Sequence, residues 1–153
     1  MEEVEMKLLS ELQANCKQSL RDLSHKLGIP MSTIHDKIRK FEKNGIIKKF
    51  SAIIDGSKLG FPITAFVLVS VRPTSKKLKV SQQELTKAIS KYPQVQEVYI
   101  ITGEWDILVK MKGKDLAEIG DLVVSKIREM HGVDKTFTIN IFETAKETSD
   151  VAV

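Results

Sequence analysis

The sequence predicts an α+β chain in two parts, with three helices at the N-terminal end and a β-α-β-β-α-β arrangement after them. Three observations predict this class. Apolar residues recur every three or four positions as far as about Asn44, which is the period of amphipathic helices. From Ala65 onward, β-branched strand patterns alternate with helical patterns. The 153 residues, 42% of them apolar, suffice for one ordinary domain or two small ones with packed cores.

The first two helices carry clear boundary signals. Helix one is predicted over about Glu3–Asn15. Helix two is predicted to start at Ser19, because Asp22 three positions later completes a capping box. The leucines expected to be buried in these helices are Leu8, Leu9, Leu12, Leu20, Leu23 and Leu27.

A third helix follows a three-residue break. Gly28-Ile29-Pro30 ends helix two, the next helix is predicted over about Met31–Asn44, and Gly45 ends it. Its apolar residues have i, i+4, i+7 spacing, so one stripe faces a core; they are Ile34, Ile38 and Phe41. Ile46–Phe50 is expected to continue as a short extended basic ribbon. Helix, turn, helix and ribbon together indicate a winged helix-turn-helix.

The opposite face of the third helix has short hydrogen-bonding side chains near its start and cations toward its end. This distribution suits a helix that contacts base edges and phosphates of DNA. The side chains expected at base edges are Thr33, His35, Asp36 and Arg39, and Ser32 serves a base or a phosphate. The side chains expected at phosphates are Lys40, Lys43, Lys48 and Lys49. An ion pair with Arg39 or Lys40 is an equal alternative for Asp36.

The positive charge of the chain is concentrated on this helix and ribbon. Residues 31–49 contain six lysines and arginines against two acidic residues, whereas the whole chain has a formal charge of +4. The remainder therefore sums to about zero, and the positive field lies where DNA contact is expected. A solvated helix face is the alternative interpretation.

The start of the chain and its cysteine content indicate a cytoplasmic protein. Met1–Glu5 is acidic where a signal peptide would be basic, and no apolar run approaches a membrane span. The single cysteine, Cys16, cannot form an internal disulfide and matches a reducing compartment. A buried or incidental thiol is favoured over a redox sensor.

Asp55–Pro62, with two glycines and a proline, is predicted as a linker between a domain at 1–54 and a domain at 63–153. In the second domain, strands are expected over Ala65–Val71, Val95–Thr102, Ile107–Lys112 and Asp134–Glu143. Helices are expected from a capping box at Ser81 and Glu84, and over Asp115–His131 before Gly132. Their inward residues are predicted as Leu85, Ala88, Ile89, Tyr92, Leu116, Ile119, Val123, Ile127 and Met130. This order is the ferredoxin-like plan.

The basic loop 72–80 is expected to be solvated, with DNA contact as the weaker alternative.

Apolar residues on both sides of the first strand predict a second layer on the sheet. Phe66 and Leu68 alternate with Val67, Val69 and Val71, and the second strand has Val98, Tyr99, Ile100 and Ile101. Two helices cover only one face of such a sheet, so we expect a second copy of the chain to cover the other. Cover by the tail, Thr144–Val153, is the alternative.

The two parts together resemble the leucine-responsive/AsnC (feast-famine) family of bacterial and archaeal transcription regulators. The matching segments are Leu8-Leu9-x-x-Leu12, Ser19-Leu20-x-x-Leu23, Leu27-Gly28-Ile29, Ser32-Thr33-Ile34, Lys37-Ile38, Phe41-Glu42, Gly45-Ile46-Ile47, Ala52-Ile53-Ile54-Asp55, Leu59-Gly60 and Gly103-x-x-Asp106. The resemblance implies a DNA-binding domain, an effector-sensing domain of ferredoxin-like fold, and dimers that assemble into octamers. Pro30 departs from the family, which often has a capping residue there.

The resemblance also implies an amino-acid effector held between dimers near the Gly-x-x-Asp turn. A free amino acid needs a carboxylate for its ammonium group and backbone N–H groups for its carboxylate, which this turn can supply. The expected effector contacts are Thr102, Gly103, Glu104, Trp105, Asp106, Thr136 and Thr138. Ordinary turn chemistry is an equal alternative for Gly103 and Asp106. Trp105 departs from the pattern, and it either stacks on a ligand, fills the pocket or packs between dimers.

The predicted function is a sequence-specific transcription regulator whose oligomer responds to a small effector. A ligand-independent architectural protein that wraps DNA is the first alternative. An enzyme is the second, because haem-pathway decarboxylases resemble this two-domain layout. The three histidines, His25, His35 and His131, are scattered, and no Cys/His spacing indicates a metal. We therefore predict no enzymatic activity, no cofactor and no metal site.

Overall fold

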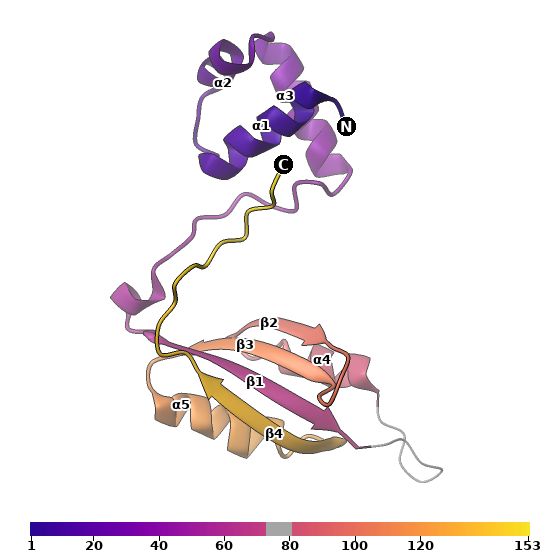
Figure 1. Cartoon of the computed structure of the whole chain (residues 1–153), viewed down its shortest axis with the longest axis vertical. Helices are drawn as coiled ribbons and strands as arrows, with labels where there is room; N and C mark the ends of the chain where they lie inside the picture. Colours follow the sequence, from indigo (N-terminus) through magenta and orange to yellow (C-terminus); the bar gives the residue numbers. More distant parts are fainter. Residues whose placement is uncertain (73–80) are drawn as a thin grey trace. The chain divides into compact units, whose positions relative to one another are not determined.

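The computed structural model describes residues 1–72 and 81–153, so that all of the basic loop except Arg72 lies outside the described residues. The described chain divides into two compact units (Figure 1). Met1–Ile53 and Lys146–Val153 form the first unit, and Ile54–Ala145 form the second.

The first unit contains three helices, α1 (Glu3–Ala14), α2 (Leu20–Leu27) and α3 (Met31–Lys43). The capping box predicted for α2 is confirmed: the N–H of Asp22 donates to the hydroxyl of Ser19 at 3.1 Å, and the Asp22 carboxylate accepts from the Ser19 N–H at 3.3 Å. The buried core of the unit is Leu8, Leu9, Leu12, Leu23, Ile34 and Phe41. Leu20 was expected in this core but is exposed, because the first residue of α2 lies at the rim of the three-helix packing.

The turn and the end of α3 both depend on glycine. Gly28 and Gly45 have φ of 67° and 70°, a left-handed conformation that glycine adopts without steric cost. After Gly45, the N–H groups of Ile46 and Ile47 both donate to the carbonyl of Phe41, at 2.9 and 3.2 Å. These amides close the end of α3, and in the first unit the described segment 46–50 forms no β-strand. The expected ribbon is therefore not part of a β-ladder.

The C-terminal tail is joined to α1 by one side chain. The carboxamide of Gln13 donates to the carbonyl of Val151 at 2.9 Å and accepts from the N–H of Val151 at 2.8 Å. A single amide therefore satisfies both backbone groups of one residue, as a neighbouring β-strand would.

The second unit is a four-stranded antiparallel sheet with helices packed on it. Its strands are β1 (Ile63–Val71), β2 (Val95–Ile100), β3 (Ile107–Gly113) and β4 (Val133–Asn140), in the order β2-β3-β1-β4 (Figure 1). Its helices are the 3₁₀ turn η1 (Gly56–Leu59), α4 (Gln82–Ile89), α5 (Leu116–Asp121) and the π-helical η2 (Leu122–Ile127). The βαββαβ order and this strand order confirm the predicted α+β, ferredoxin-like class.

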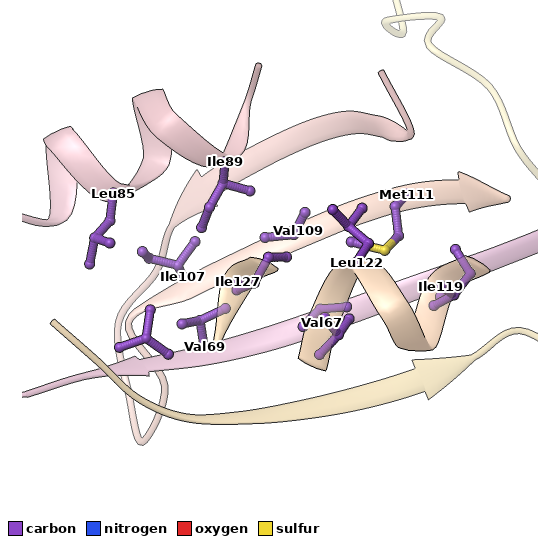
Figure 2. Close-up of a cluster of buried hydrophobic side chains, with 13 residues drawn as sticks. Val67, Val69, Leu85, Ile89, Ile107, Val109, Met111, Ile119, Leu122 and Ile127 are labelled. Carbon is purple, nitrogen blue, oxygen red and sulfur yellow. The ribbon is translucent and has the colours of Figure 1, made fainter. Parts of the chain in front are cut away.

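The helices bury one face of the sheet. Figure 2 shows side chains of α4, β1, β3 and the α5–η2 segment pointing into one shared core. The central strands supply Ala65, Val67, Val69, Ile107, Val109 and Met111, and the helices supply Leu85, Ile89, Ile119, Leu122, Val123 and Ile127. The core therefore lies between the helices and the odd-numbered residues of β1 and β3.

Two predictions for this unit, the single long helix and the burial of Leu116, are corrected. The single helix expected over 115–131 is a short α-helix followed by a π-helix. Leu116 is 58% exposed, because it directly follows the N-cap Asp115 and precedes the first buried position, Ile119. Part of the expected linker is also ordered: Asp55 accepts from the N–H of Ser57 at 3.0 Å and caps η1.

Candidate functional site

The side chains predicted to contact DNA lie on α3 and directly after it. Seven of these nine residues are charged or imidazole side chains, and all seven are exposed: His35, Asp36, Arg39, Lys40, Lys43, Lys48 and Lys49. Ser32 is exposed as well, and Thr33 is half-buried. Because Ile34 and Phe41 are buried beneath them, α3 presents a polar and basic face away from the core.

One lysine of α3 is withdrawn from this face. The ammonium of Lys37 donates to Glu2 at 2.9 Å and to Glu5 at 3.2 Å, and its side chain is only 18% exposed. Both carboxylates stabilise the charged form, so the pKa of Lys37 is raised above its usual value. The sequence count of positive charge included Lys37, but its charge is neutralised inside the unit.

Asp36 has a different neighbour from the two that were considered. Its carboxylate lies 3.7 Å from Nδ1 of His35, and the described structure pairs it with neither Arg39 nor Lys40. Both Asp36 and His35 are exposed, so each remains accessible to a base edge.

The predicted effector turn is built around Asp106. One carboxylate oxygen accepts from the N–H of Val71 at 2.7 Å, and the other accepts from the side-chain amide of Gln82 at 2.8 Å. Its own N–H donates to the carbonyl of Val69 at 3.0 Å. Asp106 thus ties the turn to the end of β1 and the start of α4, which is a structural role; an effector contact stays a prediction. Gly103 has φ of 119° and allows the chain to reverse here.

Trp105 packs against two other side chains of the same chain, Phe137 and Lys135. Its ring centroid lies 6.2 Å from that of Phe137, and the Lys135 ammonium lies 4.8 Å from the Trp105 centroid. Lys135 is also 3.6 Å from the carboxylate of Glu104. A cation over an aromatic face is favourable, so these four side chains form one cluster beside the turn.

Thr136 and Thr138 lie apart from this cluster. Their partners on β1 are Val69 and Val67, which are buried beneath the helices. Residues directly opposite on neighbouring strands share a face, so both threonines point to the helix-covered side of the sheet. Trp105 packs against the other side, and within one chain the structure does not bring these threonines to it.

The helix-free face of the sheet carries a group of neighbouring apolar side chains beside the Lys110–Glu97 ion pair. Residues that alternate with the buried positions share this face, and the strand register places them side by side: Phe66, Leu68, Tyr99, Leu108, Phe137 and Ile139. Phe137 remains 55% exposed, and Tyr99 and Ile139 are exposed too. We call this set the open face. Leu108 was missed, although the alternation of buried Ile107 and Val109 could have indicated it.

Other chemistry is limited in the part of the chain that the structure describes. No group of three or more His, Cys, Asp or Glu side chains there could hold a metal ion. Cys16 is free and exposed rather than buried. Within the same residues, none of the helices has the length and apolar character needed to cross a membrane.

Comparison with known families identifies both units. Residues 1–48 match the family model of a winged helix-turn-helix DNA-binding domain, and residues 64–151 match that of the Lrp/AsnC ligand-binding domain. A DNA-binding domain joined to a ligand-binding domain defines a transcription regulator. The chain belongs to the Lrp/AsnC family of transcription regulators.

Relatives and solved structures agree with this assignment. An uncharacterised HTH-type transcriptional regulator of Pyrococcus abyssi is 39% identical over 96% of each chain. The HTH-type transcriptional regulator FL11 of Pyrococcus horikoshii is 36% identical and covers all of this chain and 97% of its own. A Neisseria meningitidis transcriptional regulator in complex with L-Met has the same fold, with a TM-score of 0.90, 21% identity and coverage of 99% and 96%. These relatives are named as regulators, in agreement with the prediction that the chain is not an enzyme.

Proposed function

We propose that the chain is a sequence-specific regulator that binds double-stranded DNA through the exposed face of α3. The supporting observation is the polar and basic surface described above, set on the third helix of a helix-turn-helix. Thr33, His35, Asp36 and Arg39 contact base edges, with Ser32 at a base or a phosphate. Lys40, Lys43, Lys48 and Lys49 contact phosphates. Such a protein acts in the cytoplasm, where bacterial and archaeal DNA lies.

The test compares Arg39→Ala with Lys43→Ala on a duplex that the wild-type chain selects from random sequences. If Arg39 contacts a base, Arg39→Ala should weaken binding to the selected duplex by about 1–3 kcal/mol more than it weakens binding to a shuffled duplex. If Lys43 contacts a phosphate, Lys43→Ala should weaken binding to both duplexes alike. It should also lower the slope of log affinity against log salt concentration by about one. Fluorescence anisotropy at several salt concentrations measures both effects. Equal losses for Arg39→Ala on both duplexes would remove Arg39 from the base contacts.

We further propose that the second unit senses an amino acid at the turn 102–106. The match to a ligand-binding domain and the L-Met complex of a protein of the same fold support this class of effector. Thr102, Gly103 and Glu104 are exposed and available, and Trp105 lies beside them. Because the carboxylate of Asp106 is engaged within the chain, its backbone and its exposed neighbours are better placed to receive a ligand than its side chain.

A thermal-shift panel of the twenty amino acids tests this proposal. Wild-type protein should be stabilised by one or a few of them, since a ligand that binds only the folded state raises its stability. Glu104→Gln should reduce the shift, whereas Glu143→Gln should not: Glu143 is exposed and carries the same charge change, but it follows the opposite end of the sheet, where the N–H of Ile141 donates to the carbonyl of Thr64. No shift with any amino acid would favour the ligand-independent, DNA-wrapping alternative.

The open face supports a third element of the proposal, a homodimer. An apolar sheet face exposed in one chain is expected to be covered by another layer. A second copy offers the same apolar surface around a two-fold axis. Dimers also suit a DNA site with two half-sites, and we propose that they assemble further into octamers.

A further inference from the structure

Glu5 is the one buried charged side chain among the residues that the structure describes. Burying a carboxylate costs free energy unless hydrogen bonds and opposite charges compensate it. Glu5 lies in the first turn of α1, where its neighbours Glu2 and Glu3 are exposed. Its burial therefore needs an explanation that helix capping alone does not provide.

The carboxylate of Glu5 faces α3. One oxygen accepts from the N–H of Glu2 at 3.1 Å and completes the capping box of α1. The other oxygen lies 3.2 Å from the ammonium of Lys37 and 3.8 Å from that of Lys40. These contacts hold the pKa of Glu5 below its usual value, first through the Glu2 N–H and then through Lys37.

The two lysines have different surroundings. Lys37 and Lys40 are three residues apart and lie on one side of α3. Lys37 is held by Glu2 and Glu5, and its side chain is 18% exposed, whereas that of Lys40 is 64% exposed. Lys37 therefore fixes α3 against α1, and Lys40 keeps its ammonium near the same carboxylate while remaining open to an outside anion.

We propose that Glu5 is a positioning residue for DNA recognition: its carboxylate holds α3 through Lys37 and orients the ammonium of Lys40 toward a DNA phosphate. This inference rests on the proposed DNA-binding role of α3. The positioning sets the angle at which the exposed face of α3 meets base edges. A small rotation of α3 displaces Arg39 and its neighbours from their partners, although Glu5 itself does not touch DNA.

The test uses the full-length chain and two matched variants. Glu5→Gln keeps an acceptor for the Glu2 N–H and removes the charge that faces α3. Glu3→Gln removes the same charge from the same helical turn, but Glu3 is exposed and pairs with Lys7 of α1 at 2.7 Å. The measured quantity is the ratio of dissociation constants for a shuffled duplex and for the duplex that the wild-type chain selects.

Glu5→Gln is expected to lower this ratio by about three- to tenfold, the size of a typical coupling between residues in contact. Glu3→Gln is expected to leave the ratio unchanged, because a loss of negative charge acts alike on both duplexes. In a Lys40→Gln background, the change that Glu5→Gln causes in the affinity for both duplexes should shrink, since that part acts through the phosphate contact of Lys40. The change in the ratio should persist, because it acts through Lys37 and the angle of α3.

Equal ratios for wild-type and folded Glu5→Gln protein would overturn the proposal and leave Glu5 a structural residue only. If Glu5→Gln does not fold, Lys37→Met applies the same test from α3, because Lys37 is not among the predicted DNA contacts. An unchanged ratio in that variant would also overturn the proposal. If the wild-type chain selects no duplex at all, the DNA-binding proposal itself fails, and this one with it.

Discussion

Asp106 joins the turn 102–106 to the end of β1 and the start of α4. Its two carboxylate oxygens accept from the N–H of Val71 and the side-chain amide of Gln82, and its own N–H donates to the carbonyl of Val69. Removing these acceptors leaves a part-buried backbone N–H without its partner. The role of this residue in the fold and any role in binding can be separated, since an isosteric amide can replace the carboxylate. Oδ1 of asparagine can accept from Val71, and its amide can donate to a rotated Gln82 side chain.

We predict that Asp106→Ala lowers the free energy of unfolding by about 1–3 kcal/mol, the cost of an unsatisfied buried group. Asp106→Asn should retain most of the stability. Urea denaturation of both variants measures the difference. If the effector ammonium needs the charge of Asp106, the Asp106→Asn protein will keep most of the wild-type stability but will show no ligand-induced thermal shift. An alanine variant as stable as wild type would contradict the bridging role.

Glu5 also gives the first unit a pH dependence. Its pKa is lowered in the folded state, so its contribution to stability is fully present above the unfolded value of about 4.3. That contribution is lost as the pH falls through the lower folded value. The difference in unfolding free energy between wild type and Glu5→Gln should therefore be constant from pH 7 to about pH 5 and shrink below about pH 4. A difference that is the same at pH 6 and pH 3 would show that the charge of Glu5 contributes nothing.

The C-terminal tail is held to α1 by the two hydrogen bonds between the side chain of Gln13 and the backbone of Val151. We predict that the N–H of Val151 exchanges with solvent more slowly than its neighbours in the tail, as measured by hydrogen exchange. Gln13→Ala should abolish this protection. Gln13→Glu should keep part of it, because a carboxylate still accepts from Val151 but cannot donate to its carbonyl. Equal exchange along the tail in wild-type protein would contradict the contact.

Elements with local signals could be predicted from the sequence. The capping residues Ser19 and Ser81 mark helix starts through contacts three residues away, and both are observed. Strand alternation likewise indicated the apolar face of β1. The π-helical η2 could not be predicted, because a spacing of four between Ile119, Val123 and Ile127 suits either helix type.

Features that depend on packing between distant segments could not be predicted. In the sequence Glu5 is only one of the acidic residues of Met1–Glu5, and the packing of α1 on α3 is needed to reveal its contact with Lys37. Thr136 and Thr138 were grouped with Trp105 because the β4 register was unknown. By contrast, helical periodicity is enough to predict that the proposed DNA contacts on α3 are exposed, because they lie on the face opposite the buried Ile34 and Phe41.

At the scale of the whole molecule, the open face should decide the oligomeric state. Phe137→Glu places a charge at the most exposed side chain of the open face, and we predict that it weakens dimerisation roughly thirtyfold or more, as for a hot-spot residue. Val124→Glu is the matched control, because Val124 is 50% exposed on η2, away from the sheet. Sedimentation velocity of the three proteins measures the effect. A Phe137→Glu chain that associates like wild type would exclude the open face as the interface.

We propose that this chain couples DNA recognition by the first unit to a small effector bound by the second. The most direct measurement is the affinity of the full-length chain for its selected duplex, by fluorescence anisotropy, with each of the twenty amino acids in turn. We predict tight binding relative to a shuffled duplex, and a change of about 5–150-fold with one or a few amino acids, the usual size of an allosteric coupling. An affinity that is the same for both duplexes, or one that no amino acid alters, would contradict the claim.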